Sequence, residues 1–193
     1  RTPQMPKILT LCGSTREDSI NRKTVLCISN ELSNLGANVS VINLKDFEMP
    51  IYNGDDETAN GLPEAAVRFQ ECLNDHDALV IGCPEYNGFM TPVLLNTIAW
   101  ATRSPQASLD VSGFMGKPVL ITSSSPGPGG GSRSAFHLKT LLSGIGCIIS
   151  PGNFMVSGGF SAFDESGKLM DEGLQKRAVS VAEQFHVFVN KLI

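Results

Sequence analysis

The chain has 193 residues, a length typical of one domain, and a domain of this size buries about 70% of the surface of its unfolded chain. Hydrophobic residues make up 41% of the chain and charged residues 18%, which excludes a disordered, collagen-like or coiled-coil protein. The net charge is −4 without any run of basic residues, so we expect neither a nucleic-acid partner nor binding to an anionic membrane surface.

The first half of the chain alternates between strand and helix patterns. The apolar run KILTLC at 7–12 predicts a buried strand. A helix is expected at 20–35, where an apolar stripe through Val25 and Ile28 ends before Gly36. The pattern then predicts, in chain order, a strand at 38–44, a loop at 49–56, a helix at 63–73 and a strand at 77–83. Asp55, Asp56 and Glu57 are expected to form a solvated acidic turn.

The second half continues the alternation. Its predicted elements are a helix at 91–102, a strand at 117–123, a Gly/Ser/Pro-rich loop at 124–131, a helix carrying Ala135, Leu138, Leu142 and Ile145, a short strand at 147–150 and a helix at 171–192. Strands that are continuous apolar runs, each followed by a helix, are typical of a parallel sheet covered on both faces. The predicted fold class is therefore α/β, a doubly wound five-stranded parallel sheet in a three-layer α/β/α sandwich. We expect a single domain over 7–193, with 1–6 as a disordered or tag-derived tail.

A ligand of such a sheet lies beyond the carboxyl ends of the strands, where the strand order reverses. The loop after the first strand carries the hydroxyls of Ser14, Thr15 and Ser19 and the guanidinium of Arg16, at the start of a helix. This donor set suits one terminal phosphate. The loop contains neither GxxxxGK[ST] nor GxGxxG, which excludes a nucleoside-triphosphate P-loop and a dinucleotide turn. A helix cap at Ser19 beside a solvated loop would explain the same residues.

The loop after the third strand reads Pro84-Glu85-Tyr86-Asn87-Gly88. It combines a fixed φ, a flat aromatic ring and a glycine that lets the backbone approach a ligand closely. A planar heterocycle could stack there, although an ordinary turn with a partly buried tyrosine would have the same sequence.

The loop after the fourth strand, 123–131, is rich in serine and glycine. It is not a second nucleotide turn, because the third glycine of GxGxxG is absent. It is not a linker either, because core elements flank it on both sides. We therefore expect a loop that lies against a ligand.

Together the motifs G-S-T-R-x-x-S-x-N, P-E-Y-N-G, G-K-P-V and S-x-G-x-x-G-G make the chain resemble the NADPH-dependent FMN reductase family. That family includes flavodoxin-like quinone, chromate and azo-dye reductases. The resemblance covers nearly the whole chain. It implies a flavodoxin-like fold, FMN as cofactor, and NADPH or NADH as electron donor.

The resemblance places the FMN phosphate on the loop after the first strand and the isoalloxazine ring against P-E-Y-N-G, with two serines closing the other side. The cofactor-binding residues that it implies are Ser14, Thr15, Arg16, Ser19, Ile20, Asn21, Pro84, Glu85, Tyr86, Asn87, Gly88, Ser124 and Ser125. We assign no catalytic side chain and no metal ligand.

The resemblance also implies a homodimer or a dimer of dimers. Where the family reads L-K-N-A-I-D-W, this chain reads LLNTIAW at 94–100, so the lysine and the aspartate are both missing. We expect Leu94, Ile98 and Trp100 to form part of an apolar face that a partner subunit buries.

The expected function is an FMN-dependent NAD(P)H oxidoreductase that passes two electrons to quinone-like or other small oxidised acceptors. Only one crevice is available in this fold, so we expect ping-pong kinetics. The alternative is a non-enzymatic flavoprotein, either an electron carrier or a redox sensor. Carriers of the flavodoxin type are usually more acidic and bracket the ring between aromatic residues, which are scarce here: one Trp and two Tyr.

Five cysteines without a CxxC pair favour a reducing compartment, so we expect a cytoplasmic protein, with an organelle after transit-peptide removal as the other reading. Cys83 ends an apolar strand, which raises the pKa of a thiol, so we expect it to be inert. No apolar stretch approaches the roughly 20 residues that span a bilayer, so no integral membrane segment is expected.

Overall fold

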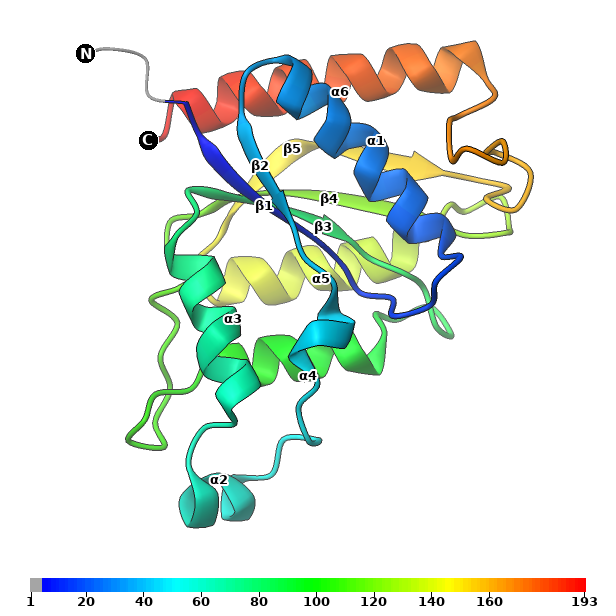
Figure 1. Cartoon of the computed structure of the whole chain (residues 1–193). Helices are drawn as coiled ribbons and strands as arrows, with labels where there is room; N and C mark the ends of the chain where they lie inside the picture. Colours follow the sequence, from blue (N-terminus) through cyan, green and yellow to red (C-terminus); the bar gives the residue numbers. More distant parts are fainter. Residues whose placement is uncertain (1–4) are drawn as a thin grey trace.

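The computed structural model describes residues 5–193 (Figure 1). The expected tail at 1–6 falls mostly on residues 1–4, which lie outside the described residues. The elements in chain order are β1 (Lys7–Cys12), α1 (Ile20–Asn34), β2 (Asn38–Val41), the 3-10 helix η1 (Leu44–Phe47), α2 (Gly54–Asn60), α3 (Glu64–Asn74), β3 (Ala78–Gly82), α4 (Pro92–Ala101), β4 (Pro118–Ser124), α5 (Ser132–Gly144), β5 (Ile148–Val156) and α6 (Glu172–Asn190).

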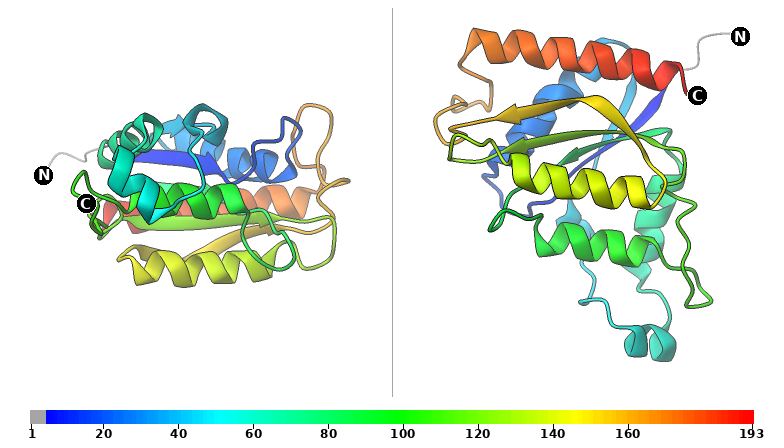
Figure 2. Two further views of the ribbon diagram at one scale, coloured as in Figure 1. Left: turned by 90° about the horizontal axis from the view of Figure 1, so that it is seen from below. Right: turned by 180° about the vertical axis from the view of Figure 1, so that it is seen from behind.

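The five strands form one parallel sheet in the order β2-β1-β3-β4-β5. α1 and α6 cover one face, and α3, α4 and α5 cover the other (Figures 1 and 2). This is the doubly wound, flavodoxin-like α/β fold, so the predicted fold class is confirmed. The strand order reverses between β1 and β3, and the carboxyl ends of all five strands lie along one edge of the sheet.

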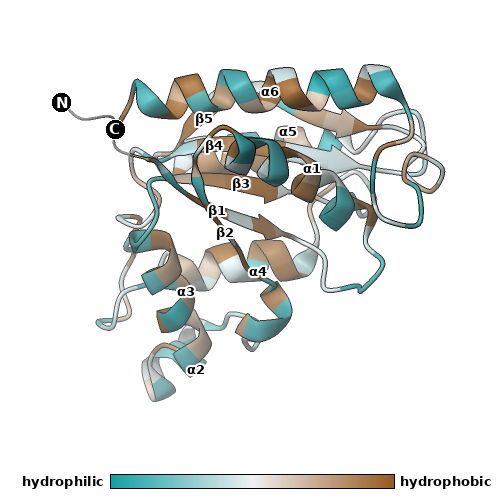
Figure 3. Ribbon diagram, turned by 45° about the horizontal axis from the view of Figure 1, so that its top comes forward, coloured by the Kyte–Doolittle hydropathy of each residue, from teal (hydrophilic) through white to brown (hydrophobic). Residues whose placement is uncertain are grey.

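The sheet separates two hydrophobic clusters. All five residues of β3 are buried; Leu79 and Ile81 face the α3–α5 layer, while Val80 faces α1 and α6. Burial on both faces explains why this strand is a continuous apolar run. α6 carries its apolar residues on the side that faces the sheet (Figure 3). Each fully buried leucine or isoleucine contributes about 1.5–3 kcal/mol relative to an exposed one.

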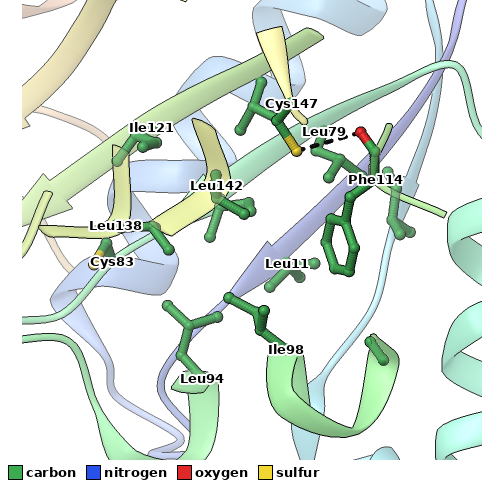
Figure 4. Packing of buried hydrophobic residues seen from close by; sticks show 14 of the residues in the cluster. Leu11, Leu79, Cys83, Leu94, Ile98, Phe114, Ile121, Leu138, Leu142 and Cys147 are labelled. Carbon is green, nitrogen blue, oxygen red and sulfur yellow. Dashed lines mark hydrogen bonds between the residues drawn. The ribbon is translucent and has the colours of Figure 1, made fainter. Parts of the chain in front are cut away.

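The residues expected to form a partner face on α4 belong to the core instead. Leu94 and Ile98 point from α4 into the cluster beneath the sheet, toward Leu11 and Phe114 (Figure 4). Trp100 is also buried, and its Nε1 donates a hydrogen bond to the backbone oxygen of Pro50 at 2.8 Å. That expectation is wrong, because the apolar side of this helix packs on its own sheet.

Two strand ends differ from the predicted ones by more than one residue. The second strand ends at Val41 rather than residue 44, and Leu44 instead begins η1. The fifth strand continues to Val156, well past the expected end at residue 150. Its pairing with β4 shifts register between Val119 and Ile121, so the Pro-Gly pair at 151–152 lies in a bulge of an edge strand, where proline is tolerated.

The segment expected to be loop and solvated turn contains the short helix α2. Asn53 caps it by accepting from the backbone N–H of Asp55 at 3.0 Å. Asp55 and Asp56 are exposed as expected, but Glu57 is only 3% exposed. Its two carboxylate oxygens accept from Arg103 at 2.8 and 2.9 Å. The expectation of a solvated Glu57 is wrong, because an arginine from 46 residues away neutralises it.

Within residues 5–193, no helix has the length and hydropathy that crossing a membrane requires. The same part of the chain holds no cluster of three His, Cys, Asp or Glu side chains with the arrangement of a metal site.

Candidate functional site

A cavity of about 100 Å³ lies at the carboxyl edge of the sheet, where the loops after β1, β3, β4 and β5 meet. Its lining residues are Ser14, Arg16, Ser19, Ile20, Asn21, Pro84, Glu85, Tyr86, Ser124, Ser125, Pro126 and Phe160. Of the residues predicted to bind a cofactor, all but Thr15, Asn87 and Gly88 line this cavity. Three loops far apart in the sequence therefore meet as the doubly wound topology predicts.

The start of α1 forms one side of the cavity. Ser19 is the N-cap, and its side chain accepts from the backbone N–H of Arg22 at 3.3 Å. The first turn of a helix carries backbone N–H groups without a partner inside the helix, together with the positive end of its dipole. The exposed Arg16 and the hydroxyl of Ser14 border the same space. A dianionic phosphate is the group that this combination suits.

Asn21 and Ser124 join α1 to the sheet. The Nδ2 of Asn21 donates to the Ser124 carbonyl at 2.9 Å, and the Ser124 N–H donates to Asn21 Oδ1 at 2.8 Å. The Ser124 hydroxyl donates to the carbonyl of Val156 at 2.8 Å. Both side chains are buried, and their polar groups bind other parts of the chain. The structure thus gives them a positioning role in the cavity wall, and a direct contact with a cofactor stays a prediction.

The Pro84–Gly88 loop ends in a tight two-residue turn. The N–H and C=O groups of Tyr86 and Phe89 are hydrogen-bonded to each other in both directions, at 2.9 and 3.0 Å. Asn87 and Gly88 between them have φ of 54° and 82°. Positive φ at both central positions defines the type I′ turn, for which Asn-Gly is the preferred sequence. The turn exposes more than half of Tyr86, so a flat ring borders the cavity.

Three predicted residues lie elsewhere. Asn87 and Gly88 form the tip of the turn, outside the cavity lining. Thr15 lines a separate cavity of about 560 Å³ between η1 and α4, whose walls are mainly apolar. A further cavity, of about 420 Å³, lies between α1 and α6. Both are larger than the cavity at the strand ends, but neither gathers hydroxyl and guanidinium donors at a helix N-terminus, so the smaller one is the better anion site.

The glycine-rich loop is attached to the segment after β5. The Ser157 hydroxyl donates to the Pro128 carbonyl at 2.7 Å, and the Gly159 N–H donates to the Ser125 carbonyl at 3.0 Å. The two segments therefore form one wall, which carries the exposed ring of Phe160 at the cavity. Phe160 and the neighbouring Pro126 were not predicted. The fifth strand ends at the same edge of the sheet as the others, so the loop that follows it could have been predicted to border the site as well.

Cys83 is buried directly before the Pro84–Gly88 loop. Burial raises the pKa of its thiol to about 12, which leaves the group protonated at neutral pH. The thiolate is the reactive form, so the environment matches the inert behaviour expected for this residue.

Comparison with known proteins connects this site to a family. The family model described as NADPH-dependent FMN reductase matches residues 6–161. The NAD(P)H-dependent FMN reductase of Pseudomonas aeruginosa is 33% identical over 190 residues, covering 96% of each chain. The quinone reductase of Escherichia coli K12 is 28% identical over 191 residues, again covering 96% of each chain. Among solved structures, a flavoenzyme NAD(P)H:acceptor oxidoreductase from Paracoccus denitrificans superposes with a TM-score of 0.81 at 26% identity, covering 97% of this chain and 99% of that one.

Proposed function

The chain belongs to the NADPH-dependent FMN reductase family, and we propose that its FMN binds at the carboxyl edge of the sheet, in the cavity lined by the loops after β1, β3, β4 and β5. The protein is an NAD(P)H-dependent oxidoreductase with FMN as its cofactor. The observation that carries the location is the convergence of a helix N-terminus, Arg16 and the Tyr86 ring on one cavity.

The residues present fit this cofactor. Hydroxyl, guanidinium and helix N-terminal donors suit its phosphate. At about 100 Å³ the cavity is smaller than the roughly 300–1,000 Å³ typical of ligand pockets, so we assign to it the phosphate end of the molecule. The exposed Tyr86 ring and the backbone of the Pro84–Gly88 loop would then support the flavin ring.

Bound there, FMN would supply the hydride and two-electron transfer chemistry between NAD(P)H and the acceptor. The contribution of the chain is to bind and orient: Arg16 and the start of α1 hold the anionic end, and the type I′ turn presents Tyr86 to the ring. We assign proton transfer to no side chain.

We propose that the acceptors are quinones or other small, flat, oxidised molecules. Relatives that match along nearly the whole chain are named quinone reductases, and the open aromatic surface at Tyr86 is compatible with a flat molecule. Donor and acceptor share the mouth between Tyr86 and the glycine-rich loop, so the oxidised nicotinamide leaves before the acceptor enters. The expected kinetic scheme is ping-pong.

The first experiment is the visible spectrum of the purified protein, with identification of the flavin that it releases. A flavin spectrum and released FMN are expected, and a protein that stays colourless after incubation with FMN would contradict the assignment. NADPH oxidation with a quinone and no added partner protein then tests the enzymatic function. An electron carrier turns over negligibly under these conditions.

Initial rates at several fixed quinone concentrations test the kinetic scheme. Parallel double-reciprocal lines are expected for one shared mouth. Intersecting lines require donor and acceptor to be bound together, and would show that a second binding region exists.

We further propose that the protein forms a homodimer or a dimer of dimers. Apolar side chains stay exposed around α4: Ile51 beside it, Phe89 before it, Leu95 on it and Phe136 on α5. The ring of His137 lies 4.7 Å from that of Phe89 and 5.9 Å from that of Phe136, which places Phe89 and Phe136 on neighbouring surface. A second copy that covers this surface would remove it from water.

We place the protein in the cytoplasm. All five cysteines are free thiols, and Cys12, Cys83 and Cys147 are buried among apolar residues, as expected for a protein of a reducing compartment.

A further inference from the structure

The Glu85 carboxylate lies in the middle of the proposed ring-binding loop and is bound by α5. Arg133 Nε donates to Glu85 Oε1 at 3.0 Å, and the Nη2 of the same guanidinium contacts that oxygen too. The backbone N–H of Ser134 donates to Oε2 at 3.4 Å. Only 12% of the Glu85 side chain is exposed. Glu85 is therefore turned toward the first turn of α5 and holds its loop against that helix.

Arg133 also covers the tip of the same loop. A Cβ atom placed on Gly88 would lie 3.4 Å from Arg133 Cζ, so the guanidinium lies against the Gly88 backbone. One side chain therefore contacts the loop on both sides of Tyr86, at Glu85 and at Gly88.

The same helical turn is fixed to the opposite wall of the site. α5 begins directly after the glycine-rich loop, and the Ser134 hydroxyl lies 2.9 Å from the Gly131 carbonyl and 3.3 Å from the Cys83 carbonyl. The first turn of α5 thus joins the glycine-rich loop to the loop that carries Tyr86.

Arg133 itself is 73% exposed. An ion pair with such an exposed partner contributes little to folding stability, because water already screens its charges. An effect of this pair on the loop can therefore be separated from an effect on the fold.

We propose that Arg133 is a positioning residue for the flavin ring: together with Glu85 it holds the Tyr86–Phe89 turn at a fixed distance from α5. This inference rests on the proposed function, in which that turn supports the ring. It assigns Arg133 no contact with the phosphate or the reacting atoms.

The first test needs no flavin. Amide hydrogen exchange of Tyr86 and Phe89 reports opening of the turn directly. Arg133→Met and Glu85→Gln should each raise these exchange rates by roughly twofold to fivefold, since each removes hydrogen bonds of a partly exposed ion pair that holds the loop. Arg133→Lys, which keeps the charge, should restore part of the protection. Arg177→Met, the same change at an exposed arginine of α6, is the matched control. If the amide exchange rates of Tyr86 and Phe89 are unchanged in both Arg133→Met and Glu85→Gln, the proposal is overturned.

The second test compares FMN with riboflavin, which lacks the phosphate. Arg133→Met should lower the affinity for FMN and for riboflavin by the same factor, about threefold to tenfold. It should also shift the absorption maximum of the bound flavin, because the contact with the ring is altered. In the double variant Arg133→Met with Glu85→Gln, the loss of flavin affinity should be smaller than the sum of the two single losses, because both single changes remove the contact between Arg133 and Glu85.

If Arg133→Met weakens the binding of FMN but not of riboflavin, Arg133 binds the phosphate, and its proposed positioning role is overturned. Wild-type protein that binds no flavin would refute the proposed function itself, whereas the exchange rates would still show whether Arg133 and Glu85 hold the turn.

Discussion

Arg16 and Arg133 both carry a guanidinium at the edge of the candidate site, and their different surroundings are the basis for two different proposed roles. Arg16 precedes the N-cap of α1 and lines the cavity. Arg133 is bound to Glu85 and covers Gly88. The sequence predicted the first role, because a donor-rich loop before a helix is a local pattern. It could not predict the second, because the partner of Arg133 lies 48 residues away.

Replacing Arg16 by alanine should weaken FMN binding while leaving turnover at saturating FMN close to that of the wild type. A charge-assisted hydrogen bond is worth about 1.5–3 kcal/mol, which corresponds to roughly a tenfold to hundredfold loss of affinity. Titration of apo-protein with FMN, followed by flavin fluorescence, measures this loss. Arg22→Ala is the control, since Arg22 lies in the first turn of α1 but does not line the cavity. Equal FMN affinity in Arg16→Ala and wild type would remove Arg16 from the phosphate site.

Gly88→Ala should lower kcat/KM more than Gly36→Ala does, although both variants should lose a similar amount of folding stability. The φ of 82° at Gly88 is left-handed backbone, which costs an L-residue about 1–2 kcal/mol, and the new methyl group would lie in van der Waals contact with the Arg133 guanidinium at 3.4 Å. Gly36→Ala has a similar φ of 89° with open space around it, so it carries the backbone cost alone. Comparing urea unfolding and kcat/KM of the two variants separates the effects. Equal kcat/KM in the two variants would argue against a role of the turn at the ring.

At the scale of elements, polar contacts attach the segment from Met49 to α2 to α4 and to the residues that follow α4. Glu57 pairs with Arg103, two residues after α4 ends, and within the segment the Tyr52 hydroxyl donates to Glu57 Oε2 at 3.0 Å. The Asn96 side chain accepts from the Tyr52 N–H at 2.9 Å. α2 was not predicted, because it has no apolar stripe. Its signals were Asn53 as N-cap and the acidic residues of its first turn.

This fastening should weaken in acid. Hydrogen bonds from Arg103 hold the pKa of Glu57 below its ordinary value of 4.5, with the Tyr52 hydroxyl adding to the effect. A lowered pKa in the folded state means that the ionised carboxylate stabilises the fold above the unfolded-state pKa, and that this contribution is lost as the pH falls through the folded-state pKa. Glu57→Gln should therefore lower Tm by several degrees at pH 7, and the difference between the two proteins should shrink as the pH is lowered from 4.5 through the folded-state pKa of Glu57.

Thermal unfolding of both proteins across that pH range measures the effect. Asp56→Asn is the control, because it removes an exposed carboxylate from the same short helix. A constant difference in Tm between wild type and Glu57→Gln over the whole range would exclude the Glu57 carboxylate as the source of the pH dependence.

At the scale of the whole molecule, exposed apolar side chains are gathered around α4 and the start of α5. The residues of α4 that were expected to face a partner are in the core, so an interface on α4 would use the other side of the helix. Leu95 is on that side, 39% exposed, at the position where the family has a lysine.

Leu95→Glu should convert the proposed dimer to monomer, because it would place a charge in an interface that excludes water. Sedimentation velocity over a range of protein concentrations measures the change. Val179→Glu on α6 is the matched control, since Val179 is 38% exposed on the opposite layer. A wild-type protein that sediments as a monomer at all concentrations would refute the proposed dimer.

The sequence by itself determined the layer architecture, because apolar runs, amphipathic stripes and helix caps are patterns among near neighbours. It also predicted the loops at the carboxyl edge, since parallel strands followed by helices bring those ends together. The strand order was observed in the tertiary structure, as were the length of β5, the wall around Phe160 and the burial of Glu57. Those features depend on contacts between residues far apart in the sequence: Ser157 and Pro128 are 29 positions apart, Ser124 and Val156 are 32 apart, and Glu57 and Arg103 are 46 apart. A carboxylate can be buried only where the fold brings a cation to it, and the residues next to it in the chain carry no record of that partner.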